Sequence, residues 1–297
     1  MKRTRTRATT CLAGTVAALA ALLAAVPVAA AGHDGRVVTV AHRGASHAAP
    51  ENTLAAVDLA RSLGIAWVEN DVQRTRDGTL VVLHDPTLAR TTDVEQKFPG
   101  RAPWKVGDFT WKEISALDAG AWKGPRWRGQ RVPSLAQYLD RVERTGRNLV
   151  LEVKQPQDHP GLAADIVRTL RDLGWLDRAH VARRLLVQSF DAGSIRTVHR
   201  LRPDVRTAFL GTPAVADLPA YARFTDQINS LHTTLSPGYW AAVHALTGPH
   251  GRRLEAYAWT VDDPARAVTL ARWGADGIIT NRPDLVAAAL RRAGYPG

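Results

Sequence analysis

Cysteine is almost absent from this sequence of 297 residues: Cys11 stands alone, which excludes disulfides within the chain and metal sites built on several thiolates. Lysine is also scarce, because 33 of the 39 basic residues are arginine, and these are spread along the chain. The net charge of +11 therefore indicates an arginine-rich surface and argues against a nucleic-acid interface, which needs a clustered basic patch. With 45% hydrophobic and 23% charged residues, the composition is that of a globular protein.

Residues 1–31 have the pattern of a secretory signal peptide. An apolar run from about Leu12 to Val28 ends at Ala29-Ala30-Ala31, a small-x-small cleavage site. The run is short for a transmembrane helix, and the basic residues before it are Lys2, Arg3, Arg5 and Arg7. We expect a Sec-type signal peptide cleaved near Ala31, with an uncleaved anchor as the alternative. Loss of its four basic residues lowers the net charge of the secreted, extracellular remainder from +11 to +7.

The remaining residues, 32–297, alternate β-rich runs with helical stretches, which predicts one α/β domain with a mostly parallel sheet. The candidate strands are Val37–Ala41, Ala66–Asp71, Leu80–Leu83, Asn148–Glu152, Leu185–Ser189, Arg206–Leu210, Ile228–Leu231, Leu254–Thr260 and Gly277–Thr280. The candidate helices are Thr53–Leu63, Trp111–Ala116, Ser134–Glu143, Leu162–Leu173, Ser194–Arg200, Pro237–Leu246, Pro264–Ala271 and Pro283–Ala289.

Nine strands are one more than an eight-stranded α/β barrel needs. The second and third runs are separated only by Arg76-Asp77-Gly78, which is too short for a parallel crossover, so this corner departs from a regular repeat. The longest irregular stretch, Asp85 to Thr110, is expected to form a loop at the rim.

Ionisable residues follow four of the apolar strands directly. They are His42-Arg43, Glu69-x-Asp71, His84-Asp85 and Glu152-x-Lys154. In a parallel barrel the carboxyl ends of the strands meet at one face, where such barrels carry their chemistry. We therefore expect these side chains to converge, with the two histidines at equivalent positions on separate strands.

The carboxylates in this group suit a divalent cation. Glu69 and Asp71 are two residues apart on a strand, so their side chains point the same way, and Glu152 adds a third carboxylate from another strand. Three anionic oxygen ligands suit one hard ion, Ca²⁺ or Mg²⁺. The alternative is a set of solvated acids at a strand edge.

The remaining polar residues suit chemistry on a phosphate ester. His42 and His84 could act as base and acid across one reacting centre, because imidazoles titrate near neutrality. Arg43 and Lys154 could bind phosphate oxygens, although structural hydrogen bonds and salt bridges are the alternatives. Together with a metal, these residues indicate phosphoryl transfer or hydrolysis of a phosphate ester.

Eight short motifs occur in an order that resembles the glycerophosphodiester phosphodiesterase family. They are His42-Arg43-Gly44, Pro50-Glu51-Asn52-Thr53, Glu69-x-Asp71, Thr75-x-Asp77-Gly78, His84-Asp85, Glu152-x-Lys154, Trp259-Thr260 and Thr280-Asn281-x-Pro283. The resemblance implies a TIM (β/α)8 barrel and hydrolysis of glycerophosphodiesters to glycerol 3-phosphate and an alcohol.

The same resemblance implies roles for individual residues. It makes His42 and His84 the acid–base pair, with His42 favoured as the base. It makes Glu69, Asp71 and Glu152 the metal ligands, and Arg43, Lys154 and Trp259 the substrate and phosphate contacts. Glu51 and Asn52 would support the site. Attack by the glycerol 2-hydroxyl, through a cyclic phosphate, and direct attack by water both remain open.

Two other functions fit the same residues. The first is a phospholipase D of the same fold acting on lysophospholipids, which would need an apolar rim. Candidates for that rim are Trp104, Phe109, Trp111, Trp122, Trp127, Tyr239 and Trp240, with buried packing as the alternative. The second is a secreted protein that binds phosphate esters without turning them over, although binding alone needs no acid–base pair. Head-group preference and oligomeric state stay open.

Overall fold

Eight parallel strands close into a barrel in the computed structural model, which describes residues 35–296; the expected signal peptide lies outside this range. The sheet order is β1-β9-β8-β7-β6-β5-β4-β2-β3, and β1 also pairs with β2, which closes the barrel. The nine strands match the nine predicted runs: β1 (Val38–Ala41), β2 (Trp67–Arg74), β3 (Leu80–Val82), β4 (Asn148–Val153), β5 (Leu185–Ser189), β6 (Arg206–Leu210), β7 (Gln227–Leu231), β8 (Glu255–Trp259) and β9 (Gly277–Thr280).

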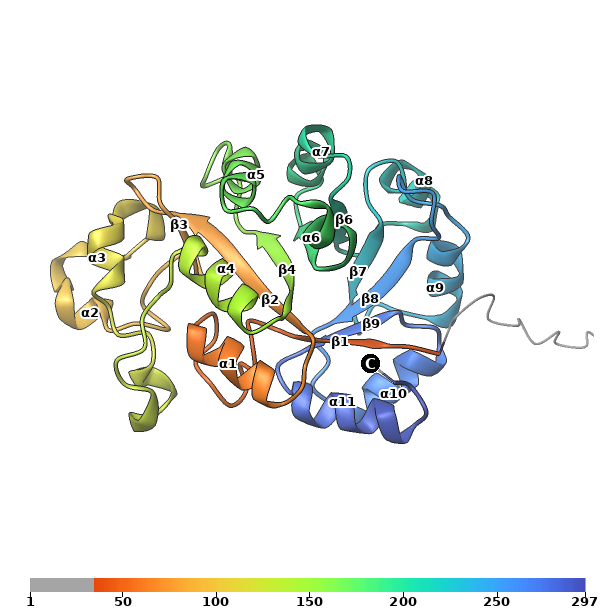
Figure 1. Ribbon diagram of the computed structural model, residues 1–297, viewed down its shortest axis with the longest axis horizontal. Coiled ribbons are helices and arrows are strands. Elements are labelled where there is room, and N and C mark those ends of the chain that lie inside the picture. The colour runs from red at the N-terminus through yellow and green to blue at the C-terminus, as the bar shows by residue number, and fades with distance from the viewer. Residues whose placement is uncertain (1–34, 297) are drawn as a thin grey trace, which may run out of the picture. The chain divides into compact units, whose positions relative to one another are not determined.

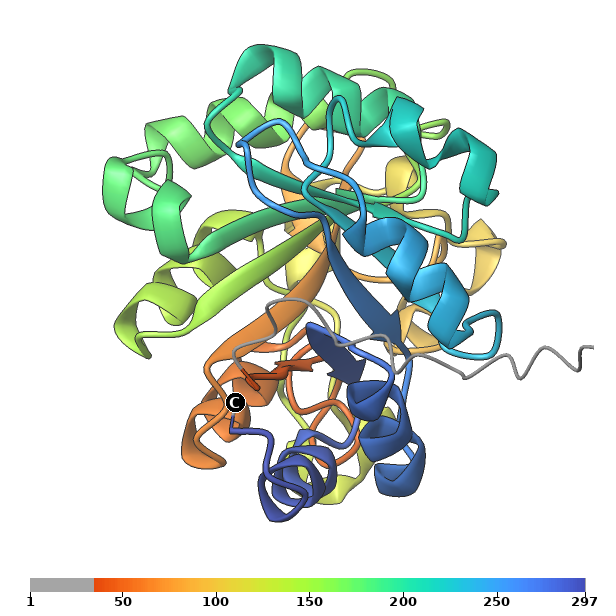
Figure 2. The ribbon, with the colours of Figure 1, turned by 90° about the vertical axis from the view of Figure 1, so that its right-hand side faces the viewer.

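Helices lie on the outside of the strands (Figures 1 and 2). All eight predicted helices are present, as α1 (Leu54–Ser62), α3 (Trp111–Ser115), α4 (Leu135–Arg144), α5 (Leu162–Asp172), α7 (Ala192–Leu201), α9 (Pro237–His244), α10 (Pro264–Arg272) and α11 (Pro283–Arg292). Three short helices were not predicted: α2 (Val94–Lys97), α6 (Arg178–Arg183) and α8 (Leu218–Tyr221). Four to six residues are too few for a helical period to stand out in a sequence. None of the helices in residues 35–296 is long and apolar enough to cross a bilayer.

Side chains at the helix starts explain why several of these helices begin where they do. Ser134 accepts a hydrogen bond from the Gln137 backbone, and the Gln137 side chain accepts one from the Ser134 backbone, which makes a complete capping box. The side chains of Thr53 and Asp263 accept hydrogen bonds from backbone N–H groups in the first turns of α1 and α10, and Pro264 also lies in the first turn of α10.

Strand β3 is the extra, ninth strand and does not belong to the parallel barrel, which confirms the departure from a regular repeat expected at this corner. It pairs antiparallel with the far half of β2, with Val72 opposite Val82 and Arg74 opposite Leu80. The turn at Arg76-Asp77-Gly78 is too short for a crossover, so the chain can only return as a hairpin. The expectation that His84 and His42 occupy equivalent positions is therefore wrong: His84 reaches the barrel mouth by a return strand, and Leu83 N–H donates to the Asp71 carbonyl at 2.9 Å.

The segment between β3 and α4 is also more ordered than the rim loop that was expected. Together with β3 it forms a small apolar core whose members include Leu88, Val94, Phe109, Ile114 and Leu117, all fully buried. In Figure 1 this insertion, with α2 and α3, lies beside β3 at one side of the barrel. The insertion is therefore a packed platform next to the carboxyl ends of β1 and β2.

The tight turn after β1 generates a first prediction, on stability. Gly44 has φ +76°, and a Cβ there would lie 2.6 Å from the Ala56 Cβ and 2.8 Å from the Ala56 backbone carbon. Gly78 has φ +87° but open space around it, so it is a matched control. We expect Gly78→Ala to cost only the left-handed backbone, about 1–2 kcal/mol. Gly44→Ala should lower the free energy of unfolding by about 1–3 kcal/mol more, because α1 must shift.

Urea denaturation of both variants checks this prediction. Equal destabilisation of the two proteins would contradict the close packing of the turn against α1.

Candidate functional site

Three buried carboxylates meet at the carboxyl ends of β2 and β4. Glu69 and Asp71 lie on β2, and Glu152 on β4 is in register with Asp71. One oxygen from each residue lies within 4.8 Å of the other two, and all three residues are at least 95% buried. The predicted convergence of these three residues is confirmed, because period-two spacing on one strand and parallel register with the next put them on the same side.

Burial of three like charges shifts their pKa values apart. Burial, together with the Asp71 charge, raises the pKa of Glu69 well above its usual range and that of Glu152 to about 7. Burial would raise the pKa of Asp71 too, but the Lys154 and Arg43 cations outweigh it and hold that pKa below its usual range. Glu69 Oε1 and Asp71 Oδ1 are buried and accept no hydrogen bond, so these two carboxyl oxygens remain available to a ligand.

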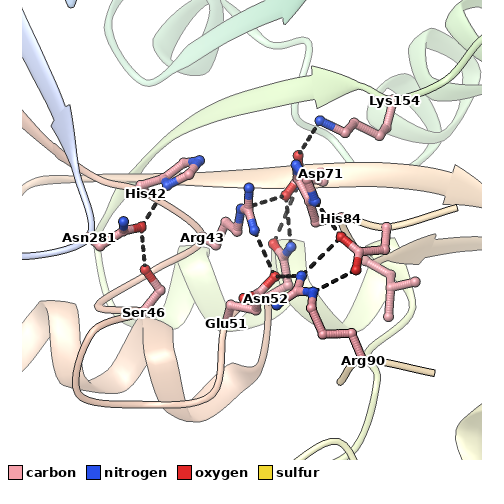
Figure 3. Close-up of polar contacts among 12 residues, drawn as sticks. His42, Arg43, Ser46, Glu51, Asn52, Asp71, His84, Arg90, Lys154 and Asn281 are labelled. Carbon is pink, nitrogen blue, oxygen red and sulfur yellow. Dashed lines mark hydrogen bonds and ion pairs between the residues drawn. The ribbon is translucent and has the colours of Figure 1, made fainter. Parts of the chain in front are cut away.

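Two cations stand against this carboxylate group. Lys154 Nζ lies 2.8 Å from Glu152 Oε1 and 3.4 Å from Asp71 Oδ1. Arg43 Nε lies 3.5 Å from Asp71 Oδ2 (Figure 3). Burial lowers the pKa of both cations, but the neighbouring carboxylates, Asp71 foremost, together outweigh it, and both pKa values are raised. The two side chains therefore stay charged beside the space where a phosphate would meet the carboxylates.

His42 is held in one orientation by an amide. Its Nδ1 lies 2.7 Å from Asn281 Oδ1, which also accepts from Ser46 Oγ at 2.9 Å. Asn281 Nδ2 donates to Asp262 at 2.8 Å, and this fixes which end of the amide faces the ring. The Nδ1 atom must therefore donate, which leaves a lone pair on Nε2, 4.0 Å from Glu69 Oε2. Burial lowers the pKa of His42 to about 4, so the ring is a neutral base at pH 7.

His84 is oriented by a carboxylate instead. Its Nδ1 lies 2.7 Å from Asp85 Oδ1, which leaves Nε2 for the cavity. Burial lowers the pKa of His84, although the Asp71 charge acts in the opposite direction. Asp85 in turn accepts from Arg90 Nε at 2.6 Å, and its pKa is about 2 because these hydrogen bonds outweigh burial. The two histidines thus present Nε2 atoms held by different partners.

Both imidazoles face one small cavity of about 70 Å³, which Arg43, Lys154 and Trp259 also line. A larger cavity of about 350 Å³ adjoins it and shares Glu152, Lys154 and Phe190 with it. The Phe190 ring is half exposed and stands edge-on to Trp259, with ring centres 5.3 Å apart. The arrangement places two imidazoles and two cations around a small space, with further room beside it.

The two supporting residues predicted from the sequence contact this group directly. Asn52, with φ +59°, donates from Nδ2 to Asp71 Oδ2 at 2.8 Å. Glu51 accepts from Arg43 Nη1 at 2.8 Å and also from Arg90. Every candidate site residue therefore lies in or beside the two cavities.

Sequence reasoning missed several residues of the site. They are Arg90, Gln188, Phe190, Asp262 and Asn281, of which Asn281 was part of a motif without an assigned role. For Phe190 the signal was its place directly after a predicted strand. For Arg90 and Asp262 the sequence carried no comparable signal.

The aromatic rim considered for a lipid substrate is not borne out by burial. Phe109 and Trp240 are fully buried, and Trp122, at 39%, is the most exposed of the seven candidates. None of the seven lines the two cavities described above, whose aromatic residues are Phe190 and Trp259.

Comparison with known proteins agrees with this site. Residues 42–285 match the family model described as "Glycerophosphoryl diester phosphodiesterase family". A glycerophosphodiester phosphodiesterase of Bacillus subtilis is 32% identical over 262 residues, which cover 84% of this chain and 85% of the relative. A glycerophosphodiester phosphodiesterase of Caldanaerobacter subterraneus is 30% identical over 261 residues, which cover 87% of this chain and 100% of the relative.

Solved structures share the barrel. A putative glycerophosphoryl diester phosphodiesterase from Silicibacter pomeroyi has a TM-score of 0.76 at 27% identity, covering 89% of this chain and 96% of its own. A phosphodiesterase from Oleispira antarctica, in complex with the product sn-glycerol-3-phosphate, has a TM-score of 0.74 at 26% identity. The match covers 86% of this chain and 96% of that one. Family match, sequence identity and shared fold together show that this chain belongs to the glycerophosphoryl diester phosphodiesterase family and is an enzyme of that class.

Proposed function

We propose that the enzyme hydrolyses glycerophosphodiesters to glycerol 3-phosphate and an alcohol, with one divalent cation and with His42 and His84 as its acid–base pair. The observation that carries this proposal is the pair of oriented imidazoles facing a cavity beside three buried carboxylates. The product bound in the Oleispira antarctica relative supports glycerol 3-phosphate as the product here.

The donor set fits a hard divalent cation. Glu69, Asp71 and Glu152 supply oxygen ligands only, and two buried oxygens among them lack hydrogen bonds. Ca²⁺ and Mg²⁺ both prefer such ligands. When bound, the cation supplies Lewis-acid polarisation of a phosphate oxygen.

The chain's own residues would perform the proton transfers. His42 Nε2, with its lone pair, would take the proton from the attacking hydroxyl, either the glycerol 2-hydroxyl or water. His84 would give a proton to the departing alcohol. Where the 2-hydroxyl attacks, water would then open the cyclic phosphate to give glycerol 3-phosphate. Arg43 and Lys154 would offset the negative charge that builds on the non-bridging oxygens.

The cavities favour a small, water-soluble diester over a lysophospholipid. A space of about 70 Å³ holds little more than the phosphate region, so the rest of the substrate would extend into the cavity of about 350 Å³. The aromatic residues expected to receive an acyl chain do not line either space. The apolar lining that these cavities offer an acyl chain is confined to a few side chains, of which Phe190 and Trp259 are the aromatic ones.

We extend the proposal to secretion. Residues 1–31 carry the basic segment, apolar run and cleavage site of a Sec-type leader. Protein recovered from the culture medium should begin near residue 32 by mass spectrometry. A secreted form that retains residues 1–31 would contradict cleavage near Ala31.

Cation binding should release protons. Without the cation, a pKa of about 7 keeps the Glu152 carboxyl partly protonated near pH 7, and burial raises the pKa of Glu69 as well. Because the cation needs both carboxyls ionised, its affinity should rise from pH 6 to pH 8. Calorimetric titration with CaCl₂ or MgCl₂ in buffers of different ionisation enthalpy measures the release. Glu152→Gln should weaken binding and reduce the release, whereas exposed Glu95→Gln should change neither.

Release of glycerol 3-phosphate from glycerophosphocholine and glycerophosphoethanolamine tests the activity. We expect turnover with Ca²⁺ or Mg²⁺ and its loss in excess EDTA, because the carboxylates alone cannot polarise the phosphate. Lysophosphatidylcholine in the same assay should release little choline. Choline from the lysolipid alone would indicate the phospholipase D function, and silence on all three substrates would indicate a binding protein.

A further inference from the structure

The Arg90 guanidinium joins two carboxylates from different parts of the fold. Its Nε and Nη2 donate to Asp85 at 2.6 and 3.0 Å, and its Nη1 and Nη2 donate to Glu51 at 2.9 and 2.7 Å. Glu51 comes from the loop between β1 and α1, whereas Asp85 follows β3. Figure 3 shows the Arg90 side chain beside Glu51, and Arg90 is not among the residues that line the two cavities. Four of its five N–H groups are used in these bonds, so little remains for a substrate.

Each of the two carboxylates holds a residue that faces the cavity. Asp85 Oδ1 accepts from His84 Nδ1 at 2.7 Å, and Glu51 Oε1 accepts from Arg43 Nη1 at 2.8 Å. Arg43 lies in the left-handed region with φ +55°, where it needs such support. Arg90 itself contacts neither the cavity nor the predicted metal ligands. It binds Asp85, which is the partner of His84, and Glu51, which is the partner of Arg43.

The backbone that carries Arg90 is itself well anchored. Leu88 and Thr91, on either side of it, are buried, and Leu88 belongs to the core of the insertion. A guanidinium on this platform can fix two carboxylates in a plane, which a lysine could not do. Without it, Glu51 would keep only Arg43, and Asp85 only His84, with no group to hold the two carboxylates together.

We propose that Arg90 is a positioning residue that holds His84 through Asp85, and Arg43 through Glu51, so that the insertion completes the active site. This inference rests on the proposed function, in which His84 protonates the departing alcohol. Because the side chain is 45% exposed, its ion pairs add little to stability, and its loss should show mainly in catalysis.

The leaving group distinguishes positioning from general damage. Choline departs only with a proton, whereas 4-nitrophenolate departs without one. We therefore expect His84→Ala and Arg90→Gln to lower kcat on glycerophosphocholine by about 10²-fold or more, the scale of a lost or misplaced acid. On the 4-nitrophenyl diester of glycerol 3-phosphate, the loss in each variant should be at least tenfold smaller.

Arg101→Gln is the matched control, because Arg101 belongs to the same insertion and pairs with Glu113 at 2.6 Å, away from the cavities. It should leave the ratio of the two kcat values unchanged. An unchanged kcat in Arg90→Gln, or an equal loss on both diesters, would overturn the role proposed for Arg90.

A crystal structure of Arg90→Gln tests the inference without relying on activity. We expect the Asp85 and Glu51 carboxylates to separate and the His84 ring to lose its single orientation. If Asp85 and His84 keep their places, the inference is wrong. A wild-type enzyme that leaves both diesters intact would instead contradict the proposed function, and the crystal structure would still decide the role of Arg90.

Discussion

The concentration of negative charge between β2 and β4 is the constraint on which the site depends. Three carboxylates buried within 4.8 Å of one another are costly unless cations stand beside them. Lys154 and Arg43 meet that need within the chain, and a divalent cation would meet the remainder. Arg43, Asn52 and Gln155 lie in the loops around this group, and each has a positive φ angle. Backbone strain is thus concentrated where side chains must reach a shared charge.

The two histidines reach the cavity from different scaffolds. His42 follows a barrel strand and is oriented by Asn281, which comes from the loop after β9. His84 follows an antiparallel return strand and is oriented by Asp85, on the edge of the insertion. An amide oxygen and a carboxylate are unequal partners, because only the carboxylate adds the attraction of a full negative charge to a protonated ring. This difference supports the proposed assignment of His42 as the base and His84 as the acid, although burial lowers the pKa of both rings.

Strand positions were predictable because most strands are short, largely apolar runs rich in β-branched or aromatic residues. The carboxylate group was predictable for a simpler reason. Side chains two residues apart on a strand point to the same side of the sheet in any fold, and Glu69 and Asp71 have this spacing. Helices with a capping residue, such as Ser134 before α4, were predictable at their starts. The four-residue helices α2 and α8 were not, because tertiary contacts rather than local periodicity maintain such short turns.

The sequence by itself determined the chemistry of this protein: which acids, imidazoles and cations follow which strands, and that they suit a phosphate ester. Only the tertiary structure decided the direction of β3, the partners of the two histidines and the place of Arg90. His42 and Asn281 are 239 residues apart, and Arg90 and Glu51 are 39 apart. Such pairs form only when the barrel closes and the insertion packs, and local residue patterns carry no information on contacts made across that distance.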